Sequence, residues 1–156
     1  MEIIDAATPE HIAAARDLFR AYAASLPFDL EFQGFREELA GLPGAYAPPG
    51  GCLLLACDPG AFVGTVALKP LAPGIAEIKR LYVAPEWRGR ALGRQLLERV
   101  IAEAEVRQYR RVRLDSHRAS MRAAIALYLR LGFVEIAPYG PDLDGALGFF
   151  EKRLGV

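Results

Sequence analysis

Residues 77 to 94 read EIKRLYVAPEWRGRALGR, which predicts a strand, an arginine-rich turn and the start of a helix. Pro85 ends the strand, and leucines at helical spacing mark the helix that follows. The first turn of a helix has unpaired backbone N–H groups and partial positive charge, so Arg88, Arg90 and Arg94 oppose its dipole. A bound polyanion would reverse that penalty and would accept hydrogen bonds from the N–H groups. The turn therefore predicts a phosphate-binding site; the alternative is a solvated basic helix start that binds nothing.

The rest of the chain alternates strands and helices, without a repeat or a long linker. Thr8 is a good N-cap before Pro9, and Asp58-Pro59-Gly60 is a turn sequence. The expected strands cover residues 2–5, 52–57, 62–69, 75–83, 112–115, 133–136 and 146–154. The expected helices cover residues 9–23, 32–40, 93–109 and 121–131.

This order predicts the fold class. Hairpins in the first half predict antiparallel pairing, and the two strand-helix-strand crossovers predict some parallel pairing. We expect a single domain over residues 1–156, of the α+β class with three α/β/α layers. Its mixed, mostly antiparallel, twisted sheet would have about seven strands, in the order β-α-α-β-β-β-α-β-α-β-β.

Composition excludes some function classes. The net charge is zero, which argues against a nucleic-acid or membrane-surface partner. The arginines at 107, 110, 111 and 113 would be the candidate nucleic-acid patch, but acids surround them. Cys52 and Cys57 would point to opposite faces of one strand, so we expect reduced thiols, no metal site and a cytoplasmic protein. The N-terminus has no signal-peptide pattern, and no apolar run approaches the roughly 20 residues that span a bilayer.

The strand and turn together resemble the central motif of the GNAT superfamily of N-acetyltransferases, Gln/Arg-x-x-Gly-x-Gly/Ala. Arg88, Ala91 and Gly93 stand at its fixed positions, with Ala91 where the first glycine is usual. The turn lacks the Lys-Ser/Thr of a P-loop and the GxGxxG of a dinucleotide fold. Residues 124–133, AIALYLRLGF, resemble the family's second CoA-side segment. Met121 stands where asparagine is common there.

The resemblance implies that acetyl-CoA binds where strand 75–83 separates from its parallel neighbour at 112–115. Backbone groups near the end of the first strand would pair with the pantetheine arm, and a backbone N–H there could polarise the thioester carbonyl. The pyrophosphate would lie on the N–H groups of the turn. Ser120 would substitute for the missing asparagine. The expected cofactor-binding residues are Leu81, Tyr82, Val83, Arg88, Gly89, Arg90, Ala91, Leu92, Gly93, Arg94 and Ser120.

The implied chemistry is direct attack of an amine on the thioester. An alkyl amine is mostly protonated at pH 7, so a base must remove a proton. Glu77 is the candidate base, and the alternative is that it pairs with a nearby Arg or Lys. Asp115 and His117 are second candidates. Tyr128, by its match to the family tyrosine, would protonate the departing CoA thiolate, although its spacing also fits a core-facing stripe.

Two loops, at 25–31 and 138–145, would hold the acceptor. Their acidic and aromatic groups could attract a cationic amine, or be solvated loop charge; they are Phe28, Asp29, Glu31, Tyr139, Asp142 and Asp144. The predicted function is acetyl transfer to the primary amine of a small molecule or amino acid. The alternatives are an acetyltransferase for protein N-termini or lysines, and a non-catalytic acyl-CoA-binding module. A homodimer stays open.

Overall fold

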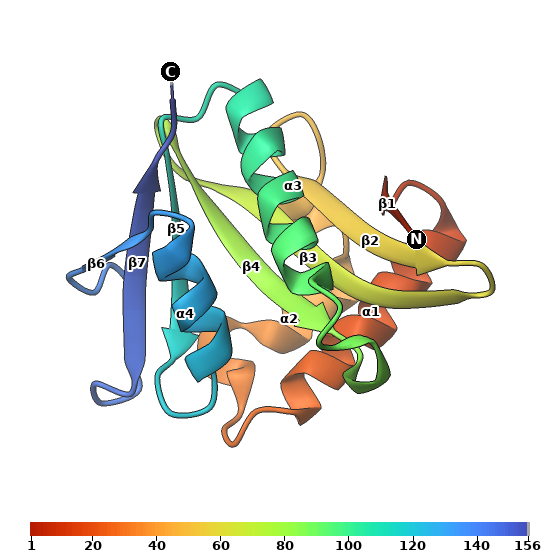
Figure 1. Cartoon of the computed structure of the whole chain (residues 1–156), viewed down its shortest axis with the longest axis horizontal. Helices are drawn as coiled ribbons and strands as arrows, with labels where there is room; N and C mark the ends of the chain where they lie inside the picture. Colours follow the sequence, from red (N-terminus) through yellow and green to blue (C-terminus); the bar gives the residue numbers. More distant parts are fainter. Residues whose placement is uncertain (156) are drawn as a thin grey trace.

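The helices and strands follow the predicted order (Figure 1). The structure is a computed structural model that describes residues 1–155. Its strands are β1 (Glu2–Asp5), β2 (Cys52–Asp58), β3 (Ala61–Ala72), β4 (Ile75–Val83), β5 (Arg111–His117), β6 (Val134–Ile136) and β7 (Leu147–Arg153). Its α-helices are α1 (Pro9–Ala24), α2 (Phe35–Gly41), α3 (Leu92–Val106) and α4 (Arg122–Arg130). Short 3₁₀ turns are η1 (Leu30–Gln33), η2 (Gly44–Tyr46) and η3 (Pro85–Trp87).

Turn residues and crossover helices set the topology of the sheet, whose order is β1-β2-β3-β4-β5-β7-β6. Tight turns join β2, β3 and β4 into an antiparallel meander, with Gly60 and Gly74 at φ values of 89° and 75° that suit glycine. β1 adds antiparallel to β2, and β7 lies antiparallel between β5 and β6. The mixed, mostly antiparallel sheet of the α+β prediction is confirmed.

The junction between β4 and β5 is short. Their parallel pairing covers only three residue pairs, from Ile75 with Arg111 to Glu77 with Arg113. Beyond Glu77 the two strands separate, so the rest of β4 has one edge without a strand partner. This separation is the feature that positions the site.

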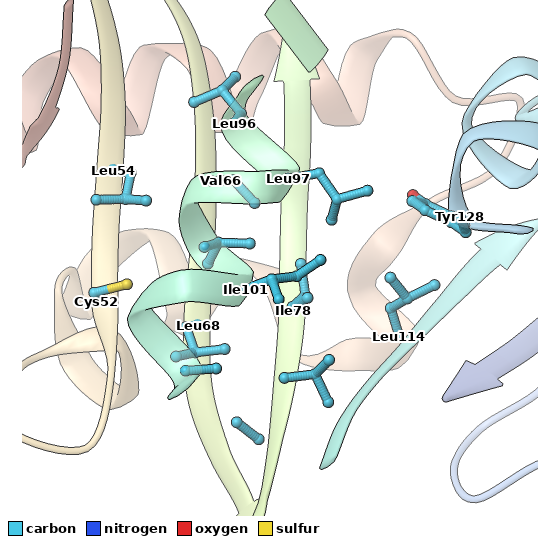
Figure 2. Packing of buried hydrophobic residues seen from close by; sticks show 14 of the residues in the cluster. Cys52, Leu54, Val66, Leu68, Ile78, Leu96, Leu97, Ile101, Leu114 and Tyr128 are labelled. Atoms are coloured by element: carbon cyan, nitrogen blue, oxygen red, sulfur yellow. The ribbon is translucent and has the colours of Figure 1, made fainter. Parts of the chain in front are cut away.

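Side chains cover both faces of the sheet, as the two-residue period of its strands requires. α1 and α2 lie behind the sheet and α3 and α4 in front of it (Figure 1). Figure 2 shows the front cluster, where Leu96 and Leu97 of α3 pack on β3 and β4. Burial of such a side chain contributes about 1.5–3 kcal/mol. Cys52 lies in the front cluster and Cys57 packs against the rear one, as predicted, and both are free thiols.

β4 contains a bulge that the sequence did not predict. Two of its residues, Arg80 and Leu81, oppose the single residue Val66 of β3, and Arg80 has a φ of 63°. The extra residue changes the alternation of side chains. Lys79 and Arg80 are consecutive, yet both contact the segments behind the sheet, whereas Leu81 packs against the front cluster.

Several boundaries differ from those predicted, and β3 extends to Ala72 rather than to residue 69. The helix expected at 32–40 is divided into η1 and α2, because Gly34 between them has a φ of 72°. β5 extends through His117, and α3 ends at Val106 rather than near residue 109. Within residues 1–155, no helix has the length and apolar character needed to cross a membrane.

Candidate functional site

The arginine-rich turn leads from β4 through η3 into α3. Gly89 and Ala91 have φ values of 78° and 61°, so the chain turns twice through the left-handed region before the helix begins. Ala91 is the N-cap of α3, and its side chain makes no capping hydrogen bond to the first N–H groups of the helix. Those groups therefore remain available to an anion, as the sequence predicts.

The arginine side chains of the turn are partly engaged elsewhere. Arg88 donates from Nε to the Val83 carbonyl at 3.0 Å and lies over the Tyr82 ring. Arg90 stacks on Trp87, 4.7 Å from the ring centroid, and Arg94 pairs with Glu98 one turn along α3. The backbone N–H groups, rather than the three arginine side chains, are therefore the main groups that the turn offers to an anion.

A cleft of about 450 Å³ opens between this turn, the end of β4 and α4. Nine of the eleven predicted cofactor-binding residues line it: Leu81, Tyr82, Val83, Arg88, Gly89, Ala91, Leu92, Gly93 and Ser120. Arg90 and Arg94 do not line it. The end of α1 supplies Tyr22, which the sequence did not indicate because it lies far from both motifs in the chain. Ser25 and Leu26, from the loop expected to hold the acceptor, also line the cleft.

The free edge of β4 faces this cleft. The Ala84 N–H donates to the Val63 carbonyl of β3 at 2.9 Å. Hydrogen-bonding directions alternate along an antiparallel strand, so Tyr82 also bonds toward β3. Leu81 and Val83 then direct their backbone groups toward the gap between β4 and β5.

A smaller cavity of about 40 Å³ continues the cleft into the gap and shares Tyr22, Leu81, Met121 and Ala124 with it. Tyr128 lies at its end, 6% exposed, and Figure 2 shows its ring projecting from α4 toward β4. Its hydroxyl is 3.4 Å from Ser116 Oγ, which donates to it. Burial raises the pKa of Tyr128, although the Ser116 hydrogen bond opposes the rise. The ring lies in the core while the hydroxyl borders the cavity.

Glu77 is the last residue of β4 that pairs with β5, and its carboxylate is engaged. Tyr139 donates its hydroxyl to Glu77 Oε2 at 2.7 Å, and Lys69 Nζ lies 3.7 Å from Oε1. Glu77 lines neither the cleft nor the cavity that holds Tyr128. The alternative expectation, that Glu77 pairs with a nearby basic residue, describes its contacts with Lys69.

Asp115 does line the cavity beside Tyr128. Its Oδ2 lies 3.6 Å from Lys79 Nζ and accepts a 3.5 Å hydrogen bond from Gln33 of η1. Burial lowers the pKa of Lys79, and Asp115 opposes that change. His117, the other candidate base, has Nδ1 2.8 Å from Ser120 Oγ and does not line the cavity.

In each of the two loops expected to hold the acceptor, an acidic side chain accepts a hydrogen bond from a nearby backbone N–H group. Asp29 accepts from the Glu31 N–H at 2.8 Å, and Asp142 accepts from the Leu147 N–H at 3.2 Å. Tyr139 of the second loop lies against Phe149 and covers Glu77. These hydrogen bonds give Asp29 and Asp142 a structural role in their own loops, which neither of the two expectations included.

The described residues give little support to a nucleic-acid site or a metal site. Arg107 pairs with Glu103, while Arg111 and Arg113 both pair with Glu151, so three arginines of the suggested nucleic-acid patch are engaged with acids. Among the residues that the structure describes, no group of three or more His, Cys, Asp or Glu side chains could hold a metal ion.

Comparisons with known proteins agree on one family. The sequence profile of the acetyltransferase (GNAT) family matches residues 13–133. An uncharacterised N-acetyltransferase of Schizosaccharomyces pombe is 37% identical over 133 residues, which cover 84% of this chain and 81% of that protein.

Solved structures have the same fold. A GNAT-family acetyltransferase from Staphylococcus aureus superposes with a TM-score of 0.82 at 22% identity, over 99% of both chains. The PaiA N-acetyltransferase of Thermoplasma acidophilum, solved in complex with coenzyme A, has a TM-score of 0.71 at 23% identity, over 99% of this chain and 100% of that one.

Proposed function

Because this chain belongs to the acetyltransferase (GNAT) family, we propose that it moves the acetyl group of acetyl-CoA to the primary amine of a small molecule or amino acid. It is an acetyl-CoA-dependent acyltransferase. One observation supports the finer proposal most: the uncapped start of α3 and the free edge of β4 border a cleft that shares four lining residues with the cavity beside Tyr128.

The opening fits acetyl-CoA. The pyrophosphate would accept hydrogen bonds from the N–H groups of the turn between Gly89 and Arg94. The pantetheine arm would run along Leu81 and Val83, whose backbone groups lack a strand partner. Its thioester would then reach the small cavity beside Tyr128. The T. acidophilum neighbour holds coenzyme A in its own structure, which supports a CoA site in this fold.

The reaction needs two proton transfers. The amine loses a proton to a base, and its nitrogen attacks the thioester carbonyl carbon. The C–S bond then breaks, and Tyr128 donates its proton to the departing thiolate, which leaves as the free thiol of CoA. The raised pKa of Tyr128 keeps its hydroxyl protonated throughout the neutral range. Solvent reprotonates the phenolate after release.

For the base, we propose Glu77, directly or through a water, with Asp115 as the rival. Tyr139 would have to release Glu77 when the acceptor binds. The rival is favoured by its position, because Asp115 borders the same cavity as Tyr128. Removal of a general base typically lowers the rate by about 10²–10⁴-fold. The larger loss of kcat/KM, in Glu77→Gln or in Asp115→Asn, identifies the base.

A small acceptor is preferred over a protein for a structural reason. Tyr139 closes over the sheet at Glu77, and the cavity beside Tyr128 has only about 40 Å³. A protein N-terminus or a lysine would need a more open groove at this point. An acetylated peptide product, formed faster than any small-molecule product, would reverse this assignment.

The test combines binding and turnover. At about 100-fold over its Kd, acetyl-CoA should raise the free energy of unfolding by about 2.7 kcal/mol, which thermal unfolding detects. A panel of small amines is then assayed for release of CoA thiol with a thiol-reactive dye. Binding without turnover on any amine or peptide would leave the non-catalytic module. No stabilisation by acetyl-CoA would refute the proposed site.

A further inference from the structure

Arg80 has an unusual conformation for an arginine inside a strand. Its φ of 63° lies in the left-handed region, which glycine adopts freely and other L-residues adopt at a cost. It is also 4% exposed. Conformations of this kind persist where the surrounding structure holds them in place.

The contacts of the guanidinium show what holds it. Nε and Nη2 donate to the two carboxylate oxygens of Glu38 on α2, at 2.8 and 2.7 Å. Nη1 donates to Gln33 Oε1 at 3.0 Å. The rings of Tyr22 and Phe35 lie 5.9 and 5.2 Å from its central carbon. We call Arg80, Glu38 and Gln33 the Arg80 clamp.

The charge on Arg80 is compensated despite its burial. Burial alone would lower the pKa of the guanidinium, but the hydrogen bonds and charge of Glu38 outweigh it, and the pKa is raised. A planar guanidinium that donates two parallel hydrogen bonds to one carboxylate is fixed in direction as well as in distance. The clamp therefore ties the backbone at the bulge to α2.

The bulge decides what the end of β4 presents to the cleft. Because Arg80 is the extra residue, Leu81 and Val83 turn toward the α3 side while Tyr82 packs against the rear cluster. A strand without the bulge would shift this alternation by one residue. The backbone N–H of Leu81, the first after the bulge, would then no longer point into the gap.

We propose that Arg80 is a positioning residue for acetyl transfer, because the Arg80 clamp fixes the bulge that aims the Leu81 N–H at the thioester carbonyl. This inference rests on the proposed function. Arg80 touches neither acetyl-CoA nor the acceptor amine, and acts through the backbone of Leu81. The anion turn, more than seven residues further along the chain, keeps its own geometry.

The variant that tests the clamp is Glu38→Gln, which keeps the size of the side chain and removes its charge and one acceptor oxygen. Loss of one well-placed oxyanion donor costs about 10²–10³-fold in turnover, so kcat should fall by about 10²-fold. The KM for acetyl-CoA and the Kd for CoA should change far less than kcat, because the pyrophosphate site is untouched. Glu37→Gln, an exposed neighbour on α2, is the matched control and should keep the wild-type kcat.

A second pair of variants separates positioning from general stability. Leu42→Ala opens a cavity at the end of α2 without touching the clamp, and it should lower the melting temperature while leaving kcat unchanged at temperatures where the protein is folded. Arg80→Lys keeps a positive charge but lacks the planar fork, so it should lose kcat as Glu38→Gln does. Equal kcat values in wild type and Glu38→Gln would overturn the proposal.

An activity-independent measurement keeps this result distinct from a failure of the proposed function. In ¹⁵N-leucine-labelled protein, the Leu81 amide resonance, assigned by its loss in Leu81→Met, should shift or broaden in Glu38→Gln and not in Glu37→Gln. An unchanged Leu81 resonance in Glu38→Gln refutes the clamp even if no amine acceptor is ever found. A changed resonance in a protein that turns over no amine supports the clamp and contradicts the acetyl transfer.

Discussion

Ala91→Gly should stabilise the protein, although replacing alanine by glycine usually does the reverse. Ala91 is exposed and has φ and ψ of 61° and 15°, so its methyl group contributes strain and little packing. The left-handed conformation costs an L-residue roughly 1–2 kcal/mol, and the extra freedom of glycine in the unfolded chain offsets about 0.4–1 kcal/mol of the gain. The net effect is about 1 kcal/mol, or about 2–4 °C in melting temperature for a chain of this size.

The assay is thermal and urea unfolding of three single variants. Gln108→Gly, at a φ of 64° just beyond α3, should also stabilise, and it lies outside the cleft. Ala126→Gly, at an exposed position within α4, is the control and should destabilise by about 1 kcal/mol. If Ala91→Gly lost as much stability as Ala126→Gly, the left-handed turn before α3 would be refuted.

The remaining predictions concern chemistry, pH and packing. Tyr128→Phe should lower kcat by at least about 10²-fold with an unchanged Kd for CoA by calorimetry, and unchanged turnover would exclude the acid role. Burial raises the pKa of five tyrosines: Tyr22, Tyr46, Tyr109, Tyr128 and Tyr139. Unfolded tyrosines lose their protons near pH 10 while these keep theirs, so the native state binds more protons and stability to urea should fall with rising pH, by up to about 1.4 kcal/mol per pH unit for each. The fall is measured above pH 10.5, because Lys79, with its lowered pKa, contributes the opposite slope below its ordinary value; a flat profile there would contradict the burial of these hydroxyls. Gly51→Ala should cost about 3 kcal/mol, since its Cβ would lie 2.5 Å from a backbone oxygen of β3, and a wild-type melting temperature would argue against that close approach.

The sequence predicts those features that depend on local chemistry. Pro85 and the glycines at 60 and 74 locate the turns, and the arginine-rich turn locates the start of α3. The order of strands follows because hairpins and crossovers leave few arrangements of the chain. Most of the predicted cleft residues are adjacent in sequence to these signals, which is why they could be found.

The bulge is a different case, because glycine is the usual sign of such a conformation and β4 has none there. The available signal was a pair of adjacent charged residues, Lys79 and Arg80, in the middle of a buried strand. Two neighbours on a regular strand face opposite sides, so one of them would have been buried without a partner. The bulge lets both reach acids and amides behind the sheet.

The contacts of Glu77 could not be predicted for another reason. Tyr139 lies 62 residues away in the chain, on a loop whose path depends on β6 and β7. Sequence pattern gives the face of a strand but not which distant side chain covers it. The same holds for Tyr22, which reaches the cleft because α1 crosses behind β4.

The short β4–β5 junction has a consequence for cohesion. The four strands from β1 to β4 and the three that follow form two halves of one sheet, and only three residue pairs join them directly. A pantetheine arm that is hydrogen-bonded along the free edge of β4 would add a further connection between the two halves of the sheet. Bound acetyl-CoA would then contribute to the stability of the sheet itself. The resistance of the protein to proteolysis would therefore rise with the concentration of acetyl-CoA.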